Sequence, residues 1–249
     1  MLDKELPRPG EVFAIQGHTA FVITPEIPES DPASGTDTAE PIPWVWYAPT
    51  LPGLPGAAEV WMFDRFLGAG IAIAGIDVGE SYGNPAGRRL FTAFHEELTE
   101  QRGFSNRACL LARSRGGLML YSWAVEHPDC VACIAGIYPV CNPESYPGVE
   151  KAAPAYGLTV DEFIEALPTI NPVERIATLA RADVPIFHIH GDDDSIVPLE
   201  GNSALLARRY SELGGTMTLN VVEGGGHDMW DGWFECEALV EFVVANHSC

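Results

Sequence analysis

The sequence contains very little positive charge. Lysine occurs only at positions 4 and 151, and 14 Lys and Arg residues stand against 35 Asp and Glu residues, which gives a formal net charge of −21. Such a chain repels nucleic acid and anionic membranes. We therefore expect neither as a partner. The negative charge is interpreted as a solvated acidic surface, with attraction of a cationic substrate as the alternative.

Long apolar runs are also absent. A membrane span needs roughly 20 apolar residues, whereas the longest candidate, Ile71–Ile76, contains Gly75 and is followed by Asp77. Residues Met1–Pro7 lack the basic start and apolar stretch of a signal peptide. These absences predict a cytoplasmic protein, or a secreted or periplasmic one from which a signal peptide has been removed.

The six cysteines do not form a recognisable metal or redox pattern. Cys109 and Cys133 lie in apolar runs, where thiols act as small hydrophobic groups. Cys130 and Cys133 have Cys-x-x-Cys spacing, but no second pair or histidine has ligand spacing. We expect no metal and no cofactor.

What the sequence does contain is a regular alternation of short apolar runs and helical patterns. It opens with a predicted hairpin at Val12–Ile23 and a polar loop at Glu26–Pro43. The runs that follow predict strands at Trp44–Ala48, Ile71–Ile76, Ala108–Ala112, Val131–Ile137, Pro185–Ile189 and Thr218–Val222. The helical patterns lie at Ala57–Leu67, Arg88–Gln101, Arg115–His127, Ser203–Leu213 and Phe234–Asn246. Together they predict one α/β domain, residues 1–249, with a mostly parallel sheet between two layers of helices and a site at the carboxyl ends of the strands.

A serine follows one of these strands in the setting of a nucleophile elbow. Ser114 lies between an apolar run and a helical pattern, with Ala112 and Gly116 as small residues at −2 and +2. Small residues are needed there because strand and helix backbones crowd together. Ala112 departs from the Gly-x-Ser-x-Gly pattern. Ser114 is the predicted nucleophile, and the alternative is an ordinary strand-to-helix turn.

Two further polar motifs end later strands. One reads His-Gly-Asp-Asp-Asp-Ser-Ile-Val-Pro at 190–198, and the other reads Gly-Gly-Gly-His at 224–227. The order serine, aspartate, histidine along the chain is that of α/β-hydrolases. Asp192 is a rival for the acid. A three-aspartate metal site is disfavoured because so tight a turn would have to splay the carboxylates.

From about Trp44 to the C-terminus the chain resembles the α/β-hydrolase superfamily. Gly-Asp-x-Asp-x-x-Val-Pro at 191–198 is similar to the acid loop of that superfamily, and the resemblance implies Asp194 as the acid and His227 as the base. It also implies the α/β-hydrolase fold. Small esterases, dienelactone-hydrolase-like enzymes, carbohydrate esterases and oligopeptidase-like domains share these motifs, so the subfamily stays open.

An acyl-transfer mechanism needs two N–H donors for the oxyanion. The backbone N–H of Arg115 is the expected first donor, since it directly follows the nucleophile. The second is expected from the loop Pro-Thr-Leu-Pro at 49–52. Prolines have no N–H, so Thr50 or Leu51 must supply it, and we favour Leu51.

Two arginines flank the nucleophile. Arg113 and Arg115 could pair with buried acids such as Asp77, Glu80 or Asp228, because an unpaired buried charge is costly. In the alternative, Arg115 reaches the cleft and binds a carboxylate or the oxyanion. Arginine after the serine resembles the Ser-Arg pattern of glucuronoyl esterases, although the rest of that motif is absent.

Other polar and aromatic residues near these motifs have less defined roles. Tyr82 and Trp230 are candidate substrate-binding residues, with packing in a loop and against the last helix as the alternatives. His188 and His190 share one face of a predicted strand, and we expect both to be packed rather than catalytic.

The connection 142–181 interrupts the alternation. It carries no obvious strand and one expected helix near Thr159–Leu167, and it far exceeds the usual connection of about 2–6 residues. It predicts a cap or lid insertion, in which residues of about Pro143–Leu167 cover Ser114.

The leading prediction is a carboxylic-ester hydrolase that acts on a small-molecule or saccharide ester, including an acyl- or uronate-bearing carbohydrate. One alternative is an oligopeptidase-like peptidase, although the roughly 40 residues before Trp44 are too few for a propeller. The other is a non-catalytic binding protein with the same fold, which the presence of all three triad residues disfavours. The sequence does not predict an oligomeric state.

Overall fold

The computed structural model describes residues 4–26 and 40–247. Most of the predicted polar loop at Glu26–Pro43, and the first three residues of the N-terminal segment, lie outside the described residues. Eight strands form one sheet in the order β1-β2-β4-β3-β5-β6-β7-β8. They are β1 (Glu11–Ile15), β2 (His18–Ile23), β3 (Trp44–Tyr47), β4 (Ala72–Ile76), β5 (Ala108–Arg113), β6 (Val131–Ile137), β7 (Ile186–Gly191) and β8 (Met217–Val222).

Only the first two strands interrupt the parallel arrangement. β1 and β2 pair antiparallel with each other, and β2 pairs antiparallel with β4. Their connection is the two-residue turn Gln16–Gly17, in which both residues have positive φ (50° and 84°). Such a turn matches the twist of a hairpin. All other neighbouring strands are parallel, which confirms the predicted hairpin and the mostly parallel sheet.

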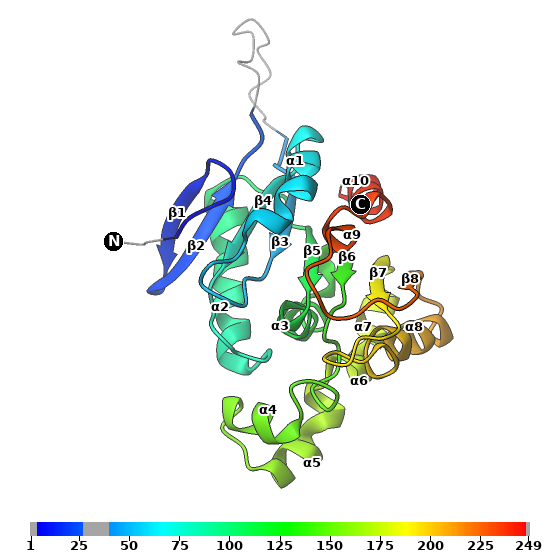
Figure 1. The fold of residues 1–249 in the computed structure, drawn as a ribbon. Coiled ribbons are helices and arrows are strands. Elements are labelled where there is room, and N and C mark those ends of the chain that lie inside the picture. Colours follow the sequence, from blue (N-terminus) through cyan, green and yellow to red (C-terminus); the bar gives the residue numbers. More distant parts are fainter. Residues whose placement is uncertain (1–3, 27–39, 248–249) are drawn as a thin grey trace, which may run out of the picture.

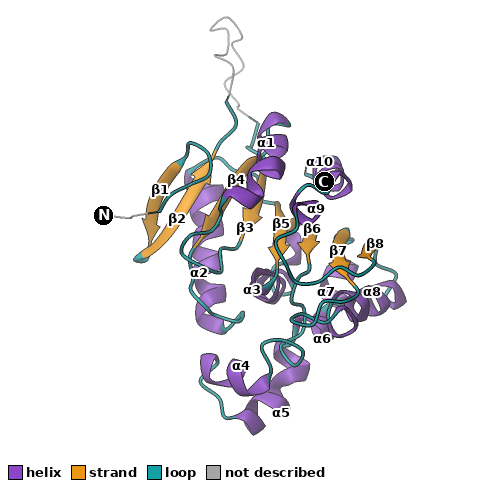
Figure 2. Cartoon of the chain, viewed as in Figure 1, coloured by secondary structure: helices purple, strands orange, loops and turns teal. Residues whose placement is uncertain are grey.

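Helices cover both faces of the sheet (Figure 2). They are α1 (Val60–Gly68), α2 (Pro85–Glu96), α3 (Arg115–Ala124), α4 (Val149–Ala155), α5 (Val160–Ile170), α6 (Pro172–Arg175), α7 (Ala177–Arg181), α8 (Ser203–Glu212), α9 (Asp231–Phe234) and α10 (Glu237–Asn246). Apolar side chains of α2, α3, α6, α7 and α8 share one core cluster, whereas those of α1, α9 and α10 share the other. Alternate residues of β3 point to opposite sides, so Trp46 joins the first cluster and Tyr47 the second.

The long connection between β6 and β7 contains more helix than the sequence indicates. Four helices, α4 to α7, occupy it instead of the single predicted one. α6 and α7 pack into the main core through Val173 and Leu179. α4 and α5 form their own apolar cluster, centred on Phe163, and lie together at one end of the molecule (Figure 1).

Candidate active site

Ser114 occupies a strained turn between β5 and α3. Its backbone lies at φ 46° and ψ −128°, a region that costs roughly 1–3 kcal/mol for a residue with a side chain. The turn fits only because Gly116 has no Cβ, since an added one would lie 2.8 Å from the carbonyl oxygen of Ala48. The crowding that the small residues of the motif predict is therefore present, and it presents the Ser114 hydroxyl at the carboxyl end of β5.

The structure brings Ser114, His227 and Asp194 together in one hydrogen-bonded series. Ser114 Oγ lies 2.9 Å from His227 Nε2, and His227 Nδ1 lies 2.7 Å from Asp194 Oδ2. Since the carboxylate can only accept, Nδ1 carries the proton and Nε2 is free to accept from the serine hydroxyl. This is the tautomer that a general base requires. Each of the three residues follows a different parallel strand of the sheet, β5, β7 or β8.

Both carboxylate oxygens of Asp194 are held by neighbouring groups. Oδ1 accepts from the backbone N–H groups of Ile196 (3.0 Å) and Val197 (2.8 Å), and Oδ2 lies 3.4 Å from His190 Nε2 as well as facing His227. Burial raises the pKa of Asp194, but the hydrogen bonds from His190, His227 and the N–H of Val197 outweigh it and hold the pKa well below its ordinary value. Asp194 is therefore an ionised carboxylate at neutral pH.

The rival acid, Asp192, lies elsewhere. Its side chain is exposed and accepts from the backbone N–H of Gly224 at 2.7 Å. It thus holds the glycine turn that precedes His227, while Asp194 contacts the imidazole.

The expected oxyanion donors come from the residue after Ser114 and from the 49–52 loop. The N–H groups of Arg115, Thr50 and Leu51 donate no hydrogen bond to any described residue. A Cβ added to Gly116 would lie 3.6 Å from Thr50 Cγ2, so the 49–52 loop packs against the first turn of α3. The Leu51 side chain is exposed. Which of Thr50 and Leu51 supplies the second donor stays a prediction.

The two arginines beside Ser114 both form ion pairs. Arg113 pairs with the buried Glu59, donates to Tyr47 Oη at 3.2 Å and stacks its guanidinium 4.8 Å from the centre of the Phe234 ring. Arg113 thus pairs with a buried acid, as one of the two alternatives predicted, but the acid is none of the three named examples, because Glu59 reaches it from the turn before α1, 54 residues earlier. No local spacing signals so distant a contact.

Arg115 pairs with Glu80, one of its predicted partners. Burial raises the pKa of Glu80, and the positive charge of Arg115 opposes that rise. Asp77 instead binds Lys4 at 3.0 Å. Lys4 Nζ also donates to the carbonyl oxygen of Leu54 at 2.6 Å, so the N-terminal segment braces the loop that carries the expected second oxyanion donor.

Tyr82 belongs to an apolar cluster beside the triad. The cluster consists of Leu118, Val140 and Val197, with Tyr82 and Tyr146 packed against it. Val140 N–H donates to the carbonyl oxygen of the nucleophile at 2.9 Å. Val197 N–H donates to Asp194 Oδ1 at 2.8 Å. The cluster is therefore tied to the catalytic constellation through the backbone.

Trp230, three residues after His227, lies at the surface. Its side chain is 53% exposed and packs edge-on against Trp233, with ring centres 5.3 Å apart. Packing against α9 is the role that these contacts show, and substrate contact stays a prediction.

Tyr138 is a site residue that sequence reasoning missed. It follows β6, has a φ of 35°, and places its ring 4.3 Å from the imidazole of His227. Its hydroxyl donates to the carbonyl oxygen of Asp228 at 3.2 Å. The one feature of the sequence that could have indicated this role is the position of Tyr138 at the carboxyl end of a predicted strand. Tyr138 thus supports the loop that carries the base.

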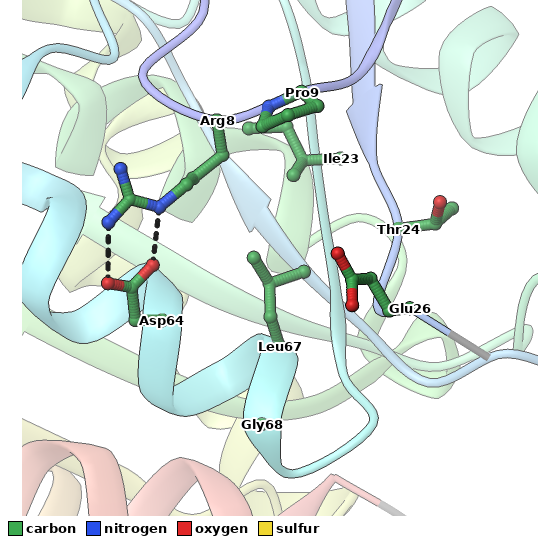
Figure 3. Close-up of a pocket in the computed structure, with 8 residues that line it drawn as sticks. All are labelled: Arg8, Pro9, Ile23, Thr24, Glu26, Asp64, Leu67 and Gly68. Atoms are coloured by element: carbon green, nitrogen blue, oxygen red, sulfur yellow. Dashed lines mark hydrogen bonds and ion pairs between the residues drawn. The ribbon is translucent and has the colours of Figure 1, made fainter. Parts of the chain in front are cut away.

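A surface cavity of about 470 Å³ lies apart from the triad. It is formed by the N-terminal segment, the end of β2 and α1, and Figure 3 shows Arg8 bridging to Asp64 across it through two hydrogen bonds of 2.6 Å. None of its lining residues belongs to the catalytic arrangement.

Residues 4–26 and 40–247 contain neither a metal-binding group of side chains nor a helix suited to a membrane. No group of three or more His, Cys, Asp and Glu side chains is arranged to hold a metal ion there. In the same residues no helix has the length and apolar character to cross a membrane.

The fold and the catalytic arrangement define a serine hydrolase of the α/β-hydrolase type. Residues 91–242, more than half of the chain, match the prolyl oligopeptidase family. The chain belongs to that family.

Solved structures of both esterases and peptidases share its fold. Est1E from Butyrivibrio proteoclasticus is 17% identical with a TM-score of 0.70, and the match covers 96% of this chain and 99% of that one. The carboxylesterase Cest-2923 from Lactobacillus plantarum is 16% identical with a TM-score of 0.68, covering 96% and 95%. A puromycin-hydrolyzing peptidase from Mycobacterium tuberculosis is 16% identical with a TM-score of 0.72, covering 96% and 39%. Similarity at these identities establishes the fold alone.

One curated protein, serine carboxypeptidase-like 46 from Arabidopsis thaliana, is 46% identical over 48 residues. The match spans 19% of this chain and only 10% of that relative's length.

Proposed function

We propose that this protein hydrolyses a carboxylic ester through an acyl-enzyme on Ser114. The observation that carries the proposal is the series of two short hydrogen bonds, 2.9 Å from Ser114 to His227 and 2.7 Å from His227 to Asp194. A serine hydroxyl is a weak nucleophile at neutral pH, and a base at this distance can take its proton during attack.

The geometry supports the following sequence of steps. Ser114 Oγ attacks the ester carbonyl carbon while His227 Nε2 takes the hydroxyl proton. Asp194 stabilises the imidazolium. The oxyanion would lie between the N–H of Arg115 and that of Leu51 or Thr50. When this intermediate collapses, the bond to the leaving alkoxide breaks, and the alkoxide takes the proton from His227. A water molecule then attacks the acyl-enzyme while His227 takes its proton, and Ser114 leaves with that proton as the carboxylic acid is released.

An ester is a suitable substrate for this site because its hydrolysis requires few catalytic groups. The alkoxide leaves more readily than an amine. A base, oxyanion donors and the small apolar cluster around Leu118 and Tyr82 therefore suffice. Arg115 would add a preference for esters that carry a carboxylate, such as uronates, since a guanidinium can hold a carboxylate with two hydrogen bonds.

A peptidase is the second candidate, and membership of the prolyl oligopeptidase family favours it. Matched substrates with the same acyl group separate the two. We expect nitrophenyl esters and acylated sugars to be hydrolysed with a kcat/KM at least about 100-fold above that of the corresponding peptide nitroanilides, a gap of roughly 2.7 kcal/mol in transition-state stabilisation. Nitroanilide hydrolysis at an equal or higher kcat/KM would establish the peptidase instead.

Ser114→Ala is the matched control for this assay. It should lower kcat/KM by about 10⁴-fold or more on every substrate that the wild type hydrolyses. The substitution is small, so the protein should still fold. Near-full activity in Ser114→Ala would contradict the assignment of the nucleophile.

A further inference from the structure

A row of buried polar side chains lies behind the triad acid. Tyr121 Oη is 2.7 Å from His188 Nε2, and His188 Nδ1 is 2.8 Å from Ser203 Oγ. Ser203 Oγ is also 2.8 Å from His190 Nδ1, and His190 Nε2 is 3.4 Å from Asp194 Oδ2. The first four side chains are completely buried. Buried polar groups are costly unless each has a partner, and here each of the four has at least one.

The protons in this row can be placed by counting donors and acceptors. His190 Nε2 is 2.8 Å from the carbonyl oxygen of Val197, which can only accept, so Nε2 carries a proton. Nδ1 of a neutral His190 is then an acceptor, and the single hydroxyl proton of Ser203 points to it. Ser203 Oγ must therefore accept from His188 Nδ1–H. Tyr121 in turn donates to His188 Nε2. The hydrogen bonds all run in one direction, from Tyr121 to His190, whose Nε2–H faces both the carbonyl oxygen of Val197 and, at 3.4 Å, Asp194 Oδ2.

The row joins the elements that carry the nucleophile and the acid. Tyr121 lies on α3, which begins directly after Ser114, while His188 and His190 lie on β7, which leads into the acid loop. Ser203 begins α8. The sheet makes room for the row at Gly136 of β6, which is paired with His188, because a Cβ there would lie 2.4 Å from His188 Cδ2.

We propose that Tyr121, His188, Ser203 and His190 position Asp194 and stabilise its carboxylate form. The proposal rests on the function proposed above. His190 is the only link in contact with the acid, and the other three fix its tautomer and ring orientation. All four are positioning residues that act through Asp194 on His227, in the way that outer partners orient the ligands of other functional sites.

Burial keeps two members of the row, His188 and Tyr121, uncharged. Burial lowers the pKa of His188 to about 3, with a further contribution from His190. Burial also raises the pKa of Tyr121, and Cys141 and Tyr210 are the other titratable groups that face it. At neutral pH His188 and Tyr121 are therefore neutral, and the ionised group at the end of the row is Asp194.

The test compares Ser203→Ala with Ser203→Thr and with Ser122→Ala. The first removes the central hydroxyl, the second keeps it, and the third removes another buried serine hydroxyl from α3 that is outside the row. Tyr121→Phe is the fourth variant, because it removes one oxygen at the far end and should fold. The readout is the rate at which a fluorophosphonate labels Ser114, which needs no knowledge of the natural substrate.

We expect Ser203→Ala to slow labelling by about 10-fold or more, Tyr121→Phe to slow it less, and Ser203→Thr and Ser122→Ala to stay near the wild-type rate. When a variant removes hydrogen-bond donors from the row, the negative charge of Asp194 is less well neutralised. A less neutralised carboxylate favours the charged form of the imidazole that it faces, so the acidic limb of the labelling rate moves up by about 0.5 pH unit or more. If Ser203→Ala instead matched Ser122→Ala in rate and pH profile and differed only in melting temperature, the proposal would be overturned.

Nitrogen NMR of histidine-labelled protein tests the row without any reaction. The expected forms are the Nδ1–H tautomer for His188 and the Nε2–H tautomer for His190. The opposite tautomer at His188 would overturn the proposed direction. A wild-type protein that shows these tautomers but is not labelled would contradict the proposed function and leave the row intact, so the two failures are distinguishable.

Discussion

At the scale of single residues, the site combines local and distant constraints. Ser114 takes a strained backbone because Gly116 allows the loop at Ala48 to approach. Arg115, the next residue, is held by Glu80 and keeps its side chain 25% exposed. A guanidinium that is fixed but accessible beside the nucleophile is suited to recognise a carboxylate on the substrate.

Arg115→Met tests this on a pair of esters that differ only in a carboxylate. We expect kcat/KM for the carboxylate-bearing ester to fall about 10-fold or more, as for the loss of one charged hydrogen bond of roughly 1.5–3 kcal/mol, with the neutral ester nearly unchanged. The double variant with Glu80→Gln removes the effect of leaving Glu80 unpaired. Arg175→Met, which breaks a distant ion pair with Glu126, is the matched control. Equal losses on both esters would assign Arg115 to the oxyanion instead.

The residues of the arrangement could be predicted where a short motif carries them. Ser114, Asp194 and His227 each follow a strand within a recognisable sequence, and chain order completes the pattern. Glu59 and Tyr138 could not be predicted, because their contacts with Arg113 and His227 depend on how distant segments lie in space. The row from Tyr121 to His190 could not be predicted for the same reason, because its residues lie on three separate elements.

At the scale of elements, the strands were predicted to within a residue or two because each is a short apolar run between turn residues. The β6–β7 connection was harder. α4 and α5 contain Pro154 and Pro168 within their last three residues, and proline is typical of loops. α6 and α7 span only 4 and 5 residues, too short for a helical period to show.

We propose that α4 and α5 are the cap of the predicted insertion. They have their own apolar cluster, and Tyr156 Oη donates to the carbonyl oxygen of Tyr82 beside the triad at 2.9 Å. The base of the connection is closed, because Asn171 Nδ2 donates to Asn142 Oδ1 at 2.9 Å.

Replacing residues 149–169 by a short Gly-Ser linker should therefore change the ratio of kcat/KM between bulky and small esters. It should leave the melting temperature within a few degrees, since the main core is untouched. A linker of scrambled α4–α5 sequence is the control for length. An unchanged ratio, together with a large loss of stability, would mean that these helices belong to the core and do not select substrates.

At the scale of the whole molecule, buried histidine and aspartate make folding sensitive to acid. The pKa of His188 is lowered to about 3, so the unfolded chain takes up a proton below its ordinary pKa near 6.5 while the folded chain does not. The pKa of Asp194 is also lowered in the folded state. As the pH falls, this carboxylate therefore takes up its proton in the unfolded chain before it does so in the folded chain. In both cases the unfolded state binds more protons, and stability falls as the pH falls.

Urea unfolding at pH 7, 5.5 and 4 checks this expectation. The free energy of unfolding should decrease at each step, by a few kcal/mol in total. High salt should be present, because it screens the self-repulsion of a chain with net charge −21. His188→Gln should have a flatter dependence between pH 6.5 and 4. A wild-type stability that did not change over this range would show that the histidine is not held neutral by burial.

The most direct test of the central claim is to identify the residue that a fluorophosphonate modifies. After labelling at neutral pH, digestion and mass spectrometry should locate one adduct on Ser114 in the wild type. Ser114→Ala should carry no adduct, and His227→Ala and Asp194→Asn should react far more slowly, because base and acid activate the same hydroxyl. An adduct on a different residue, or labelling of Ser114→Ala at the wild-type rate, would contradict the account.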